Sequence, residues 1–184
     1  MAETVRTFIS IDVPLTDKIQ CALDHLKGIG NVRPVNVSQI HLTLSFIGDI
    51  DLRKAEKLCS SLESELSDFT EFQLCVKGAG RFPPKGNPRV IWLGFEDSEK
   101  LSILADKVRS VLDSLKIGYD GKKFSPHLTL ARTNGPADIS EFIKSYSEEE
   151  FSRFTCSSVK VMKSELSPKG ARHTVMKRIE LKKN

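Results

Sequence analysis

Two short segments of the sequence repeat one another and carry side chains suited to acid–base chemistry. His41-Leu42-Thr43-Leu44 returns as His127-Leu128-Thr129-Leu130, almost half the chain later. Chance recurrence of a tetrapeptide is not expected in a chain of 184 residues, so the two copies together are a stronger signal than either alone. Histidine titrates near neutral pH, so one imidazole can accept a proton while the other donates one.

Alternation along a strand would place the polar residues of each copy on one face. His41 and Thr43 then point one way and the two leucines the other, and the second copy repeats this. Two such strands facing a shared cleft would line it with two imidazoles and two hydroxyls. This set suits in-line displacement at phosphorus, with the hydroxyls of Thr43 and Thr129 donating to the phosphate oxygens. A strained cyclic phosphate lowers the need for a metal.

The elements that must position these segments alternate between strands and helices. Periodicity predicts strands at 7–13, 40–47, 72–76, 90–95, 126–132, 154–162 and 174–181. It predicts helices at 15–26, 52–66, 101–115 and 139–146, and a glycine- and proline-rich loop at 78–88. This order favours an α+β fold over a doubly wound parallel sheet. No linker divides the chain, so we expect one domain over residues 1–184.

Composition excludes several classes of protein. Hydrophobic residues make up 39% and charged residues 28%, which is typical of a globular chain. The net charge of +4 is compatible with an anionic partner. The four cysteines form no CxxC pair, and no apolar run is long enough to span a membrane. With no signal peptide at the start, we expect a cytoplasmic protein without a membrane partner.

At the repeated motifs the sequence resembles the 2H phosphoesterases, which are named for two His-x-Thr-x motifs. The resemblance is greatest to the RNA 2′,3′-cyclic phosphodiesterases, also called the 2′-5′ RNA ligase family. It covers nearly the whole chain. The segments that carry it are Arg6–Asp12, His41–Gly48, Arg89–Gly94, Phe124–Arg132 and Lys163–Gly170.

This resemblance implies two pseudo-symmetric lobes with antiparallel sheets around a central basic cleft. It implies metal-free and cofactor-free hydrolysis of a 2′,3′-cyclic phosphate, on an RNA end or nucleotide, to a 2′-phosphomonoester. Carried over, His41 protonates the departing 3′-oxygen, His127 activates water, and Thr43 and Thr129 hold the phosphate. The residues alone do not decide which histidine is the acid. A duplicated cleft needs no partner subunit, so we expect a monomer.

One segment departs from the family pattern. Where relatives commonly carry a tyrosine after the last glycine-containing turn, this chain reads Gly170-Ala171-Arg172-His173. The histidine chemistry does not depend on that position, but base stacking could.

Four further residues are secondary candidates. Arg132 is a candidate ligand for phosphate or base, although strict alternation puts it on the face opposite His127, and a surface ion pair is equally open. Phe82, in the glycine- and proline-rich loop, is a candidate for stacking on a base. Phe46 and Trp92 are predicted to lie in the core.

Other functions fit the same residues. Joining RNA ends through a 2′-5′ linkage is the reverse chemistry in the same cleft. A module that binds a nucleotide or RNA end without turnover is a second alternative, although both copies of the histidine and threonine are intact. A zinc site is weaker, because the two histidines lack third and fourth ligands at recognisable spacing.

Overall fold

Strands make up most of the regular structure in the computed structural model, which describes residues 3–184. The strands are β1 Thr4–Asp12, β2 Val32–Pro34, β3 His41–Asp51, β4 Phe72–Phe82, β5 Val90–Phe95, β6 His127–Thr133, β7 Glu150–Cys156, β8 Ser158–Ser167 and β9 Gly170–Glu180. The helices are α1 Asp17–Lys27, α2 Leu52–Glu65, α3 Glu99–Ser114 and α4 Ser140–Tyr146, with a short 3₁₀ helix, η1, at Val37–Gln39.

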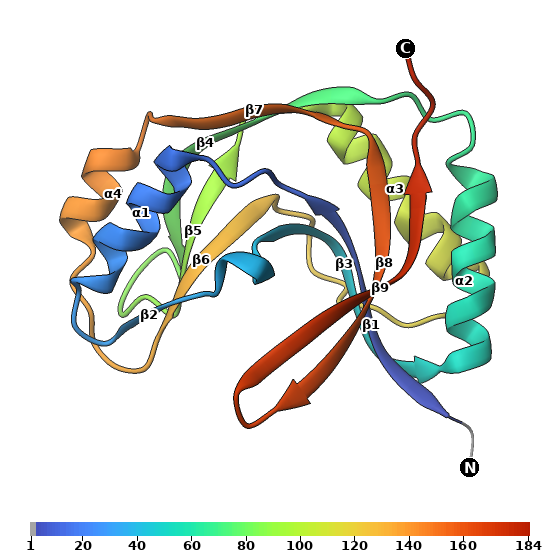
Figure 1. The fold of residues 1–184 in the computed structure, drawn as a ribbon, viewed down its shortest axis with the longest axis horizontal. Helices are drawn as coiled ribbons and strands as arrows, with labels where there is room; N and C mark the ends of the chain where they lie inside the picture. Colours follow the sequence, from blue (N-terminus) through green and yellow to red (C-terminus); the bar gives the residue numbers. More distant parts are fainter. Residues whose placement is uncertain (1–2) are drawn as a thin grey trace.

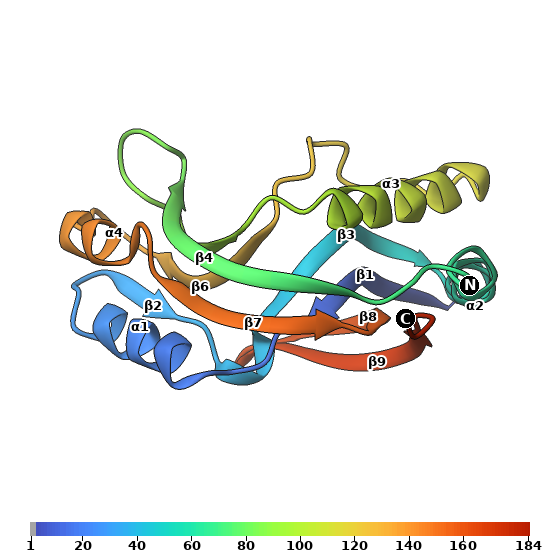
Figure 2. The ribbon, with the colours of Figure 1, turned by 90° about the horizontal axis from the view of Figure 1, so that it is seen from above.

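All ladders between these strands are antiparallel, which confirms the predicted α+β fold. The sheet order is β7-β4-β5-β6-β3-β1-β8-β9, with β2 added beside β6. We call β1, β3, β8, β9, α2 and α3 the β3 half, and β2, β5, β6, α1 and α4 the β6 half. Figure 1 shows the two halves side by side, and in Figure 2 β4 and β7 run lengthwise from one to the other.

Side-chain caps start the three longer helices. The side chains of Thr16, Asp51 and Ser98 each accept a hydrogen bond from a backbone N–H in the first turn of α1, α2 and α3. Each helix then buries one apolar stripe against the sheet, for example Ile19, Leu23 and Leu26 in α1. Helices α1 and α4 thus cover the β6 half, while α2 and α3 cover the β3 half (Figure 1). None of the helices in residues 3–184 has the length and apolar character needed to cross a bilayer.

The two halves meet where the repeated motifs lie. Strands β3 and β6 are neighbours, with Leu42 opposite Leu128 in the ladder, and neither leucine is exposed. Both belong to one continuous hydrophobic core that includes residues of both halves. The predicted duplication therefore places its two copies on adjacent strands at the centre of the sheet.

Several predicted boundaries are wrong for identifiable reasons. The loop predicted to start at Gly78 is strand as far as Phe82, because Gly78 adopts φ +77° at an irregularity and pairing with β5 continues beyond it. The strand predicted at 154–162 is broken at Ser157, where the chain leaves β4 as its neighbour and joins β1 and β9. Leu15, predicted on the buried face of α1, precedes the helix and is exposed.

Each motif strand contains a β-bulge just after its threonine. In β3 the pairing with β1 passes from Thr43 to Ser45 and leaves Leu44 as the extra residue. In β6 the pairing with β5 passes from Thr129 to Ala131 and leaves Leu130 as the extra residue. An extra residue reverses the in-and-out alternation of the strand beyond it. The two copies thus share a backbone irregularity that strict alternation does not anticipate.

The structure overturns the core prediction for two aromatic residues. Phe46 follows the bulge in β3 and is 40% exposed, with the Arg6 guanidinium 5.0 Å from its ring centroid. Trp92 lies opposite Thr129 across the β5–β6 ladder and is only partly buried, so it faces the same side as the motif threonine. The prediction for Phe46 failed because it assumed an unbroken period of two. Strand β5 does alternate regularly, and the prediction for Trp92 failed because it took the face of Val90 and Trp92 as the buried one, whereas Ile91 and Leu93 are buried.

Candidate active site

Four polar side chains of the repeated motifs share one face of the sheet. Because Leu42 and Leu128 are paired and point into the core, the residues beside them point the other way. The antiparallel register then sets His41 beside Thr129, and His127 beside Thr43. The two histidines are diagonal neighbours, about 7–8 Å apart at this kind of position. The two imidazoles therefore project from one face of the sheet at neighbouring positions.

Each imidazole is held from behind by a main-chain carbonyl two residues earlier. His127 Nδ1 lies 2.8 Å from the carbonyl oxygen of Ser125. His41 forms a hydrogen bond with the backbone of Gln39 that favours its charged form. A carbonyl can only accept, so His127 Nδ1 carries a proton and its Nε2 is left for chemistry. The contact with the Gln39 backbone helps to fix the position of the His41 ring.

Aromatic side chains from neighbouring strands pack against both rings. Phe8 on β1 stacks on His41, with ring centroids 4.9 Å apart and an interplanar angle of 27°. Phe82 on β4 meets His127 edge-on, with centroids 5.0 Å apart and an angle of 89°. Trp92 lies 5.2 Å from Phe82 and 6.5 Å from His127. These contacts restrict the rotation of both imidazoles.

The surroundings of His41 disfavour its charged form. Partial burial lowers the pKa of His41, and the nearby imidazole of His173 lowers it further. The hydrogen bond with Gln39 and the carboxylate of Asp12 oppose this shift. Burial also lowers the pKa of His173. In the free protein, therefore, His41 is biased toward the neutral state.

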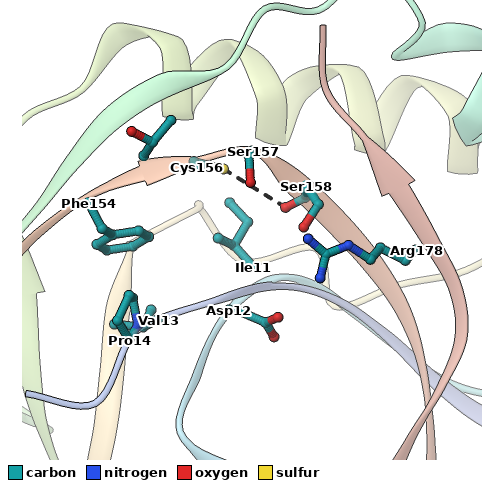
Figure 3. Close-up of a pocket in the computed structure, with 10 residues that line it drawn as sticks. Ile11, Asp12, Val13, Pro14, Phe154, Cys156, Ser157, Ser158 and Arg178 are labelled. Atoms are coloured by element: carbon teal, nitrogen blue, oxygen red, sulfur yellow. Dashed lines mark hydrogen bonds between the residues drawn. The ribbon is translucent and has the colours of Figure 1, made fainter. Parts of the chain in front are cut away.

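Asp12 is the acidic residue that reaches this side of the cleft. It lies opposite His41 in the β1–β3 ladder, and its carboxylate forms an ion pair with Lys160 on β8. Asp12 also lines a cavity of about 220 Å³ between β1, the β7–β8 junction and β9. Figure 3 shows Asp12 and Arg178 on one side of this cavity and Phe154 on another. The Asp12 carboxylate thus interacts with Lys160 and lies near Arg178, which makes it a weak partner for His41.

The structure brings the two candidate substrate-binding residues, Arg132 and Phe82, to this face of the sheet. The bulge at Leu130 keeps Ala131 buried and returns Arg132 to the side of His127, where its side chain is exposed. Arg132 lies directly opposite Arg33 of β2. Phe82 is in strand rather than loop, and its ring contacts His127 as described above.

One cluster in the described residues has the composition of a metal site. Cys75, Glu96 and Glu150 have potential ligand atoms within 4.8 Å of one another. Arg153 forms ion pairs with both glutamates, and burial raises the pKa of the Cys75 thiol to about 11. A protonated thiol and carboxylates already bound to a guanidinium are poor metal ligands. Neither motif histidine belongs to the cluster.

Comparison with known proteins identifies the family of the chain. The sequence model of the 2′-5′ RNA ligase superfamily matches residues 15–168. This chain belongs to that superfamily. The matched residues include both copies of the repeated segment, which meet at the β3–β6 junction.

Relatives of the superfamily match almost the full length of the chain. An RNA 2′,3′-cyclic phosphodiesterase from Archaeoglobus fulgidus is 31% identical over 171 residues, covering 90% of this chain and 94% of the relative. An RNA 2′,3′-cyclic phosphodiesterase from Methanothermobacter thermautotrophicus is 32% identical over 180 residues, covering 94% of this chain and 96% of the relative.

Solved structures show the same fold. The protein TT0787 of Thermus thermophilus superposes with a TM-score of 0.84 at 26% identity, covering 96% of this chain and 97% of that one. E. coli LigT complexed with 3′-AMP superposes with a TM-score of 0.78 at 26% identity, covering 97% and 99%. The fold expected from the family resemblance is confirmed.

Sequence reasoning missed two residues of the site. Phe8 was not singled out within its predicted strand, and no local signal shows that its ring meets His41. His173 was noted only as a departure from the family pattern, yet its ring centroid lies 5.6 Å from that of His41. A histidine that replaces an expected aromatic residue was the signal available for it.

Proposed function

We propose that this chain hydrolyses a 2′,3′-cyclic phosphate on an RNA end or nucleotide to a 2′-phosphomonoester, without a metal. The observation that carries the proposal is the pair of imidazoles presented on adjacent strands, His127 anchored at Nδ1 by the Ser125 carbonyl and His41 hydrogen-bonded to the backbone of Gln39. The relatives named RNA 2′,3′-cyclic phosphodiesterases, at 31% and 32% identity, support the same activity. The chain is therefore assigned as an enzyme of the phosphoric diester hydrolase class.

The proposed reaction divides two proton transfers between the histidines. A water molecule gives a proton to His127 Nε2 and attacks phosphorus, while the bond from phosphorus to the 3′-oxygen breaks. His41 donates its proton to the departing 3′-oxygen, which leaves a 3′-hydroxyl and a 2′-phosphate. Thr43 and Thr129 donate hydrogen bonds to the nonbridging oxygens from the two sides. The phosphate anion favours the charged form of His41 and so counters its bias in the free protein.

The cleft also has features suited to the rest of an RNA end. Arg132 and Arg33 lie opposite each other and are both exposed, so a phosphate between them would relieve the repulsion of two like charges. Phe82 lies beside His127, where an aromatic ring can stack on a base. We assign Arg132 and Phe82 to substrate binding on these grounds.

We further infer that residues 1–184 work as one bilobal domain and as a monomer, in the cytoplasm. A continuous core through both halves supports the single domain. One chain supplies both copies of the motif, which supports a monomeric site. Four free cysteines in the described chain suit a reducing compartment.

Product analysis of a nucleoside 2′,3′-cyclic phosphate by phosphorus NMR, in the presence of EDTA, tests the proposed function. We expect a 2′-monophosphate as product. His41→Ala and His127→Ala should each slow turnover by about 10²–10⁴-fold, the usual contribution of a general acid or base. His25→Ala is the matched control, because His25 is exposed on α1 and packs on Phe142 and Tyr146 instead.

The other outcomes separate the alternatives. Loss of turnover in EDTA, or full activity in both motif variants, would refute the metal-free histidine mechanism. Tight binding of the nucleotide with no product after long incubation would indicate a binding module. Faster joining than hydrolysis of RNA ends would indicate a ligase.

A further inference from the structure

A third histidine lies within the aromatic cluster around His41. The centroid of the His173 ring is 5.6 Å from that of His41, and the two rings are almost perpendicular, at 88°. Phe8 contacts both rings, with centroids 4.9 Å from each. His173 is thus packed against the ring proposed to act as the acid, and it comes from a distant strand, β9.

The hairpin that carries His173 is tied to the segment that carries His41. The side-chain amide of Gln39 donates a hydrogen bond to the carbonyl of Ala171, two residues before His173. The backbone of Gln39 is also the hydrogen-bond partner of the His41 ring. One residue therefore holds both the hairpin and the His41 imidazole, so the contact between the two rings is built into the fold.

One nitrogen of His173 has no partner within the protein. Its Nδ1 is buried and accepts or donates no hydrogen bond among the described residues. A buried ring nitrogen without a partner has a desolvation cost, which is greater for a charged ring. The packing alone does not need a polar ring at this position, since the edge-to-face contacts with Phe8 and His41 are ones that a phenyl ring can also make.

We propose that His173 is a positioning residue for His41, because its imidazole competes with His41 for one proton. In the free protein a proton on one ring disfavours a proton on the other, and a phosphate anion bound beside His41 favours the charged form of His41. The role as acid rests on the proposed function; the competition between the rings does not. Two titrating groups this close lose their protons as a coupled pair rather than independently.

The charged and titratable groups around His41 leave His173 as its main competitor. From β1 comes Asp12, which is bound by Lys160 of β8 and has Arg178 of β9 nearby. From β6 comes His127, whose influence on His41 is smaller than that of His173. The remaining neighbours do not titrate near neutral pH: Gln39 of η1, Phe8 and Ser10 of β1, Thr43 of β3 and Thr129 of β6.

The test is an NMR titration of the histidine rings in the free protein, which has only four histidines to assign. In the unmodified chain we expect a broadened His41 curve displaced to low pH. His173→Phe keeps an aromatic ring, and His173→Gln keeps polarity, but both remove the titrating group. Both should move the His41 midpoint to higher pH and sharpen the curve to that of a single site. His25→Phe, the same change outside the cleft, should leave it in place.

Kinetics then link this competition to turnover. The alkaline limb of kcat/KM for the cyclic phosphate should move to higher pH in both His173 variants, by the same shift as the His41 midpoint. Unchanged His41 curves in both variants would overturn the inference, even if hydrolysis is confirmed. Absence of hydrolysis in the unmodified chain, with a displaced His41 curve that both variants restore, would refute the proposed function and leave the competition standing. If the phenylalanine variant fails to fold, the glutamine variant alone decides.

Discussion

At the scale of single residues, the two motif histidines differ although their tetrapeptides are identical. His41 is enclosed by Phe8 and a second imidazole, and its pKa is lowered by burial and by that neighbour. His127 is bordered by Phe82 and Trp92 and has no second imidazole packed on it among the described residues. The lowered pKa of His41 therefore comes from its tertiary surroundings and not from its tetrapeptide.

The direction of the His41 shift predicts how activity depends on pH. If His41 is the acid, kcat/KM reports its lowered pKa in the free protein and should decline with rising pH from below the ordinary histidine value of 6.5. The bound phosphate raises the pKa of His41, so kcat should decline only at higher pH. Full pH profiles of both constants check this. Alkaline limbs that coincide would show that substrate does not change the protonation of His41.

Arg132 provides a separate test of how the RNA end is held. Because Arg132 is exposed opposite Arg33, its replacement should weaken binding of the strand rather than the chemistry. Arg132→Ala should raise KM for an oligonucleotide ending in a cyclic phosphate and lower the salt dependence of binding by about one phosphate contact, with kcat nearly unchanged. Arg53→Ala, on α2 outside the cleft, is the control. A fall in kcat alone would instead place Arg132 near the reacting atoms.

At the scale of elements, the bulges at Leu44 and Leu130 shape the cleft. Each keeps two successive residues buried, Leu44 with Ser45 and Leu130 with Ala131. The next side chain of each strand then points to the open face. This side chain is Phe46 in β3 and Arg132 in β6. The cleft floor is therefore extended by residues that an unbroken strand would send to the opposite side.

These bulges also mark the limit of prediction from sequence. Alternation correctly put His41 and Thr43 on the face opposite Leu42, because that part of the strand is regular. It failed for Phe46, because an extra residue changes a strand's hydrogen bonding without changing its residue types. It failed for Trp92 because alternation alone does not say which face of a regular strand is buried, and in β5 the buried face is that of Ile91 and Leu93. The contact of His173 with His41 joins residues far apart in the chain, and no local pattern carries such information.

Gly80 on β4 leaves the space that the Trp92 ring occupies beside Phe82 and His127. It pairs with Trp92, and a Cβ added there would lie 2.1 Å from an atom of the indole ring. Gly80→Ala should therefore displace Trp92 and, through Phe82, the His127 ring, and lower kcat by about 10²-fold, as a misplacement of roughly 1 Å can do. The chain has one tryptophan, so its fluorescence reports the displacement directly. Gly118→Ala is the control, since a Cβ there meets no atom within 4 Å.

At the scale of the whole molecule, one sheet and one core join the two halves. We expect a single cooperative unfolding transition when far-ultraviolet circular dichroism and tryptophan fluorescence are compared. Leu128→Ala should lower the free energy of unfolding by about 2–5 kcal/mol, the usual cost of emptying a fully buried leucine site, and both probes should shift together. A separate early transition in either probe would indicate that the halves unfold independently.

The route of the chain through the sheet has a further consequence. The polypeptide passes back and forth between the halves, so that β1 pairs with β8, β3 with β6, and β4 with both β5 and β7. A cut in the exposed segment between β4 and β5 would leave one motif on each fragment, and each fragment would supply strands to both ends of the molecule. Neither fragment could complete the sheet or the site alone. Activity would therefore return only when the two fragments associate. Such a split chain could serve as a reporter of molecular proximity, silent until its two parts are brought together.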